Sequence, residues 1–97
     1  MKALLVLHCI IWAKGDFTTL VDQPVSEYGM ASVSLDKMGF SFSADVIEEK
    51  MNSMQIEFKE KEVKTLLSSF DDPQNSFYTK LEVGSSEASM TCEIKKN

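Results

Sequence analysis

The C-terminal third of the chain contains two segments in which residues of two kinds alternate strictly. Every second residue from Phe77 to Val83, and again from Ala88 to Ile94, belongs to a predominantly apolar set. A period of two places such a set on one side of a β-strand, and the sequence Gly-Ser-Ser-Glu at 84–87 is typical of a turn. The pattern therefore predicts a C-terminal β-hairpin with one buried face.

The segment before this hairpin has a different spacing, in which apolar residues recur at i, i+3, i+4 and i+7. They are Val63, Leu66, Leu67 and Phe70. This spacing forms the apolar stripe of an amphipathic helix. The residues Asp-Asp-Pro at 71–73 would end such a helix, because proline disfavours the helical conformation of the residue before it. We therefore expect one helix over about residues 60–70.

The middle of the chain returns to alternation. Residues 30–46 read as a second hairpin turning at 36–39, residues 17–21 as a short strand, and residues 54–58 as another strand. Residues 45–52 allow either a short helix or a strand to Ile47 followed by a loop, and the second fits slightly better. The prediction is an α+β fold: an antiparallel sheet of about five to seven strands, the 60–70 helix on one face, and the C-terminal hairpin, all in a single domain over residues 1–97.

The N-terminal segment of about 13 residues has two interpretations. Residues 3–13 form an apolar run after Lys2, as in a signal peptide, but the run is short and His8 interrupts it. A strand in the centre of a sheet, covered on both faces, is also apolar throughout. The strand is favoured, with cleavage of residues 1–13 as the alternative. The run is too short to cross a bilayer, which takes about 20 residues.

The charge of the chain excludes several partners. Its formal net charge is −5, with 15 acidic residues against 10 basic ones, all of them lysine. An acidic surface repels nucleic-acid phosphates and anionic membranes, and bidentate recognition of phosphate needs the arginine that the chain lacks. We therefore expect no nucleic-acid and no membrane partner; the charge serves solubility or, as the sharper alternative, a basic partner.

Residues suited to catalysis are sparse and poorly arranged. The only histidine, His8, precedes Cys9, and neighbours in a strand point to opposite faces. The sequence contains no glycine-rich phosphate loop and no metal-ligand spacing, so we expect no enzyme, cofactor or metal. Cys9 and Cys92 are expected to be free buried thiols in a cytoplasmic protein; a disulfide requires neighbouring strands with Cβ atoms about 4 Å apart. The alternative location is secreted.

A set of aromatic and methionine residues forms a possible partner-binding surface, with burial in the core as the competing interpretation. These residues are Trp12, Phe17, Tyr28, Met30 and Met38. The sequence thus predicts a small acidic non-catalytic protein-binding module, such as a regulator or inhibitor of a partner protein. Sheet edges could also support a homo-oligomer. The alternative is a secreted domain that loses residues 1–13 and binds a ligand or a cell-surface partner.

Overall fold

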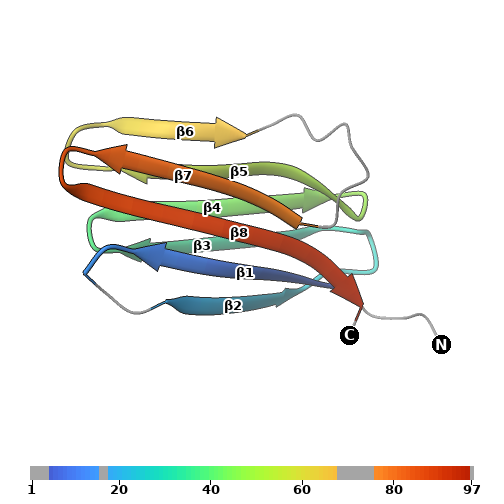
Figure 1. The fold of residues 1–97 in the computed structure, drawn as a ribbon. Helices are drawn as coiled ribbons and strands as arrows, with labels where there is room; N and C mark the ends of the chain where they lie inside the picture. Colours follow the sequence, from blue (N-terminus) through green and yellow to red (C-terminus); the bar gives the residue numbers. More distant parts are fainter. Residues whose placement is uncertain (1–4, 16–17, 68–75, 97) are drawn as a thin grey trace.

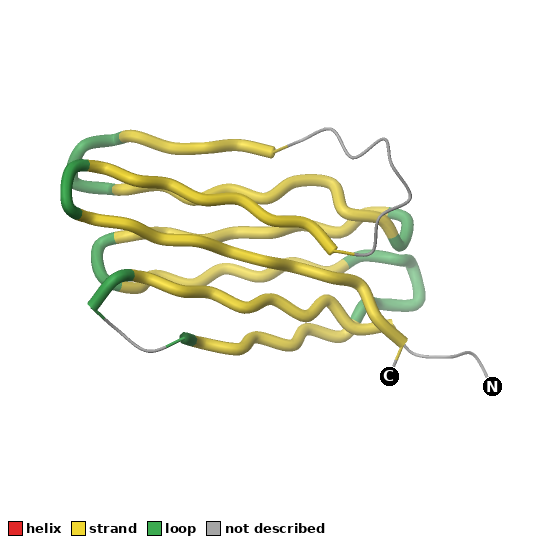
Figure 2. Tube along the Cα trace, viewed as in Figure 1, coloured by secondary structure: helices red, strands yellow, loops and turns green. Residues whose placement is uncertain are grey.

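The structure, a computed structural model, describes residues 5–15, 18–67 and 76–96 as eight β-strands in two four-stranded antiparallel sheets (Figures 1 and 2). The first sheet has the strand order β2-β1-β8-β7, and the second has the order β3-β4-β5-β6. The strands are β1 (Leu5–Ala13), β2 (Thr19–Pro24), β3 (Ala31–Lys37), β4 (Phe40–Ile47), β5 (Lys50–Phe58), β6 (Val63–Leu67), β7 (Ser76–Val83) and β8 (Ser86–Lys96).

The chain runs up and down through the strands in order, so that neighbours in sequence are neighbours in space (Figure 1). It passes from the first sheet to the second after β2 and returns after β6. The one ladder between distant segments joins β1 to β8, the first and last strands. Among the described residues no helix is long and apolar enough to span a membrane.

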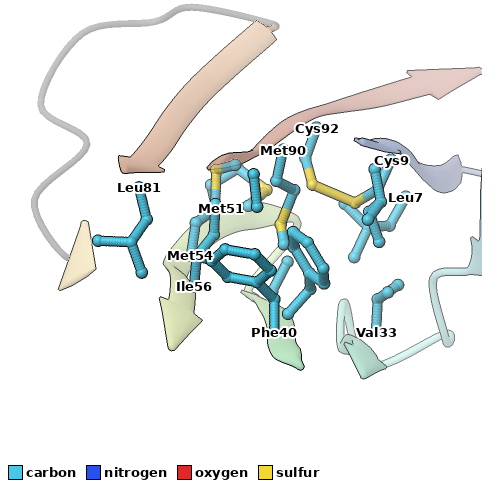
Figure 3. Packing of buried hydrophobic residues seen from close by; sticks show 14 of the residues in the cluster. Leu7, Cys9, Val33, Phe40, Met51, Met54, Ile56, Leu81, Met90 and Cys92 are labelled. Atoms are coloured by element: carbon cyan, nitrogen blue, oxygen red, sulfur yellow. A yellow bond between two sulfur atoms is a disulfide. The ribbon is translucent and has the colours of Figure 1, made fainter. Parts of the chain in front are cut away.

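The inner faces of the two sheets form one apolar core, shown in Figure 3. The alternation in the sequence produces it: Phe40, Phe42 and Ala44 of β4 are at most 2% exposed, while the serines between them lie at the surface side. The rings of Phe40 and Phe58 lie with centroids 4.8 Å apart. Burial of each large side chain contributes about 1.5–3 kcal/mol, so this layer between the sheets supplies most of the stability.

A disulfide links Cys9 of β1 to Cys92 of β8 inside this core. The two residues are direct partners in the ladder, with Cα atoms 4.1 Å apart, and both are fully buried. The expectation of free thiols was therefore wrong, because the sequence did not reveal that the first and last strands pair. Such bonds persist mainly in oxidising compartments. Cleavage after Ala13 would remove β1 and leave Cys92 without its partner.

The predicted α+β class is also wrong, because the described residues contain no helix. The expected helix at 60–70 is instead a turn followed by β6, and Phe70 lies outside the described residues. In β6, Val63, Thr65 and Leu67 pair with three of the buried residues of β5, namely Phe58, Ile56 and Met54. The spacing of these residues suits a helix, but they lie beside the edge of β5, whose backbone groups need hydrogen-bond partners. Pairing with β5 outweighs the weak intrinsic preference for a helix.

The remaining elements match the alternation more closely. β7 and β8 form the expected hairpin, with Gly84 at φ 60° in a two-residue turn, a position that favours glycine. β3 and β4 form the second expected hairpin. Residues 45–52 are neither a helix nor a strand followed by a long loop, because β4 reaches Ile47 and β5 begins at Lys50. The described strands number eight, above the expected five to seven.

Side-chain hydrogen bonds connect the edge strands of the two sheets on both sides of the molecule. Lys37 Nζ of β3 donates to Thr19 Oγ1 of β2. On the opposite side, the Thr65 hydroxyl of β6 and the Thr79 hydroxyl of β7 lie 3.1 Å apart. The edges of the two sheets therefore face each other, and a second chain would have to displace these contacts to pair with an edge strand.

Candidate functional site

The most exposed apolar side chains outside the strands' inner faces include a group at one end of the molecule. We call this region the loop end; it comprises the β2–β3 connection, residues 25–30, and the β4–β5 turn, residues 47–50. Tyr28 is 80% exposed, Met30 54% and Ile47 43%. Large apolar side chains grouped at a surface indicate a contact site more strongly than isolated ones do.

The loop end is held in one conformation by backbone contacts centred on Gly29. The Glu49 amide donates to the Gly29 carbonyl at 2.9 Å, and the Gly29 amide donates to the Ser26 carbonyl at 2.9 Å. The Ser26 hydroxyl accepts from the amides of Tyr28 and Met30 at 3.3 and 3.2 Å. Gly29 has φ +79°, and a Cβ atom there would lie 2.9 Å from the Glu49 nitrogen. Only glycine therefore fits this approach of the two segments.

The β4–β5 turn contains two consecutive non-glycine residues in the left-handed region, Glu48 at φ 54° and Glu49 at φ 63°. Two-residue turns of this geometry normally contain Asn and Gly. The left-handed conformation costs roughly 1–2 kcal/mol per residue for side chains with a Cβ atom. Strained backbone persists where its surroundings hold it in place, and here the contact with Gly29 does so.

A pocket of about 340 Å³ opens beside this turn, lined by residues of the β2–β3 connection, of β3 and of β4. Met30 and Ile47 contribute apolar walls, and Asp45 contributes a carboxylate. The Asp45 carboxylate accepts hydrogen bonds from the hydroxyls of Ser32 at 2.6 Å and Ser53 at 3.1 Å, which fix its orientation. The β4–β5 register shifts at Asp45 and Val46, and such irregularities redirect side chains at binding sites.

The charges around the pocket are mainly negative. Glu27, Glu48 and Glu49 are exposed in the same two segments, with Lys50 as the basic neighbour. Together with Asp45 they give the loop end an acidic border around apolar side chains. The arrangement suits an apolar contact bordered by positive charge, since complementary charges guide association.

The groups considered for catalysis lie elsewhere. The sulfurs of Cys9 and Cys92 are bonded to each other. His8 contacts Asp22 through Nδ1 on the outer face of the first sheet. Within residues 5–15, 18–67 and 76–96, no group of three or more His, Cys, Asp or Glu side chains is placed to hold a metal ion.

The structure separates the five residues proposed from the sequence. Tyr28 and Met30 lie together at the loop end, whereas Met38 is in the β3–β4 turn at the opposite end, with its Cε about 3.5 Å from the Cβ position of Gly15. Trp12 is half-buried on the outer face of the first sheet, and Phe17 lies outside the described residues. Sequence reasoning missed Ile47, Gly29 and Asp45, because their meeting depends on a turn without a turn-forming residue.

No protein-family model, curated protein or solved structure matches the chain.

Proposed function

We propose that this protein is a small non-catalytic protein-binding module, a regulator or inhibitor that contacts its partner through the loop end. One observation supports this most: the β4–β5 turn is fixed against Gly29, and three exposed apolar side chains lie in these two segments. A preorganised loop loses little conformational entropy on binding. Tyrosine is also among the residues that contribute most to interface energy.

The chemistry of the loop end defines the partner surface. Tyr28, Met30 and Ile47 require an apolar recess or face, and methionine adapts to irregular surfaces. The acidic border favours a partner with lysine or arginine around that recess. The pocket next to Asp45 has room for one such side chain, its aliphatic stem against Met30 and its charged group near the carboxylate.

Capture of the partner from the native host tests this proposal, because the chain provides a matched control. Met30 and Met38 are 54% and 52% exposed at opposite ends of the molecule. We expect the wild type and Met38→Ser to retain one stoichiometric protein, and the double variant Tyr28→Ala, Met30→Ser to bind it about tenfold or more weakly. Affinity is measured by titration calorimetry with the identified partner. Equal binding by all three proteins, or the absence of any stoichiometric partner, would refute the role of the loop end.

A further inference from the structure

The outer face of the first sheet contains a line of exposed apolar side chains that runs across its strands. Leu20 of β2, Ile10 of β1 and Tyr78 of β7 are 64%, 39% and 57% exposed. The ladders align these three residues with Thr91 of β8 in a single line across all four strands. We call this line the apolar row. Its continuity across the sheet distinguishes it from isolated exposed apolar residues, which need no explanation.

Charged residues lie in parallel rows on both sides of the apolar row. On the side toward Lys96, the next row is acidic and contains Asp22, His8 and Glu93; the row after it ends in Lys95. On the other side, the next row contains Trp12, Ser89 and Lys80. The row after it contains Glu82 and Glu87 with Lys14 nearby, so its net charge is negative. From the row of Lys95 to the row of Glu82 and Glu87, the net charges of the five rows are therefore positive, negative, neutral, positive and negative.

This sequence of signs is complementary to its own reverse. A two-fold axis along the apolar row would bring a second copy face to face with the first and would reverse the order of the rows. Each positive row would then lie opposite a negative row, and each apolar side chain would lie near its counterpart. A two-fold interface must be self-complementary in this way, and facing antiparallel sheets pack with their strands nearly aligned.

We propose that this face binds a second copy of the chain and forms a symmetric dimer. The dimer leaves the loop end free, so it is a property beyond the proposed partner binding. Strands lie about 4.8 Å apart and alternate residues about 6.8 Å apart, so that the five rows cover roughly 500 Å² in projection. This is below the standard interface of about 800 Å² per partner. We therefore expect a dimer with a dissociation constant on the order of micromolar.

Lys80 shows how the charged rows would contribute. Its Nζ lies 2.6 Å from Glu82 and 2.9 Å from Glu87 in the monomer. The two-fold axis would also bring it near the acidic row of the second copy, with Glu93 one strand away. Each such contact would occur twice in the dimer, and salt would weaken it.

Sedimentation velocity of the full chain with its disulfide intact, over about 1–300 µM, tests the dimer at the affinity expected for an interface of this size. We expect the wild type to change from monomer to dimer in this range and Leu20→Glu to remain monomeric. Leu66 provides the matched control: it is 58% exposed on the edge strand β6 of the second sheet, and Leu66→Glu should dimerise as the wild type does. Circular dichroism verifies the fold, and Tyr78→Lys replaces Leu20→Glu if that variant does not fold.

A charge exchange tests the symmetry itself. We expect Lys80→Glu and Glu93→Lys each to weaken the dimer about tenfold, or 1.4 kcal/mol. The double variant should restore the wild-type constant. A wild type that stays monomeric throughout, equal effects of Leu20→Glu and Leu66→Glu, or a double variant no better than the single ones would each overturn the proposal.

Discussion

The two sheets have similar inner faces but different outer faces. The outer face of the first sheet contains the apolar row, whereas that of the second contains mainly hydroxyl and charged side chains. Examples from the second sheet are Ser34, Ser43 and Asp36, and Lys59 Nζ lies 2.8 Å from the Asp36 carboxylate. The same alternation thus produces a face suited to water on one sheet and a face suited to contact on the other.

The sheets also differ in the sequence separation between their paired strands. The second sheet consists of consecutive hairpins, while the first joins β1 to β8 across a disulfide that spans 83 residues. Closing a long loop costs more entropy than closing a short one. The first sheet therefore depends on a covalent link, and the second depends on local turns.

The largest expected effect comes from breaking this link. In the chain-entropy account, a disulfide closing a loop of this length contributes about 4–5 kcal/mol to the free energy of unfolding. We expect the double variant Cys9→Ala, Cys92→Ala to lose about 2–5 kcal/mol in urea denaturation. Hydrogen exchange should increase first in β1 and β8. Uniform acceleration in both sheets would contradict the difference between them.

The same bond bears on where the protein functions. If it is present in the cell, protein from the native source should resist alkylation until a reductant is added, as intact mass would show. Two thiols that react without reductant in the unfolded protein would instead favour a reducing compartment, where such bonds are rare.

A smaller effect should distinguish the two turn regions. Gly29 and Gly84 both have positive φ, but a Cβ atom on Gly29 meets the backbone of the second sheet's turn, and one on Gly84 meets nothing within 4 Å. We expect Gly84→Ala to cost about 1 kcal/mol and Gly29→Ala to cost about 2–4 kcal/mol, because the backbone contact must also shift. Thermal or urea denaturation measures both. Equal costs would show that the loop end is not fixed at Gly29.

The smallest effects concern exposed ion pairs at opposite ends of the pH range. On the second sheet, the hydrogen bond from Lys59 lowers the pKa of Asp36; its stabilisation is present above the ordinary carboxyl pKa and is lost as pH falls through the lowered value. On the first sheet, Glu82 and Glu87 raise the pKa of Lys80; its stabilisation is present below the ordinary lysine pKa and is lost as pH rises through the raised value.

Melting temperatures of Asp36→Asn and Lys80→Gln across pH measure these contributions. Both should be small, since water and salt screen exposed pairs. The difference between Asp36→Asn and the wild type should vanish in acid, and that between Lys80→Gln and the wild type in strong alkali. A difference that vanished in strong alkali for Asp36→Asn, or in acid for Lys80→Gln, would contradict the ion pairs described.

Alternation alone predicted much of this molecule. It identified the β7–β8 and β3–β4 hairpins, because a period of two has few alternatives when one face is buried. It failed at residues 63–67. There Val63, Leu66 and Leu67 have the spacing of a helix, while Val63 and Leu67 would also share one face of a strand. Pairing with β5 decides between them, and that pairing depends on the whole sheet.

The candidate site was less accessible from sequence for a related reason. Tyr28 and Met30 stood out by residue type, but Ile47 joins them only through the turn at Glu48 and Glu49, whose residues carry no turn signal. The contact with Gly29 stabilises that turn across 20 residues of sequence. The disulfide was hidden in the same way, because it requires the register of two strands from opposite ends of the chain.

The position of the strand ends has a practical consequence for studying this protein. The chain enters β1 at Leu5 and leaves β8 at Lys96, which are ladder partners, and the Leu5 carbonyl accepts from the Val25 amide at 2.9 Å. A bulky group attached close to Leu5 or Lys96 would thus lie next to the loop end and crowd it. Immobilisation through a cysteine introduced at Ser85, in the exposed turn at the far end (Figure 1), would instead present the loop end to an incoming protein.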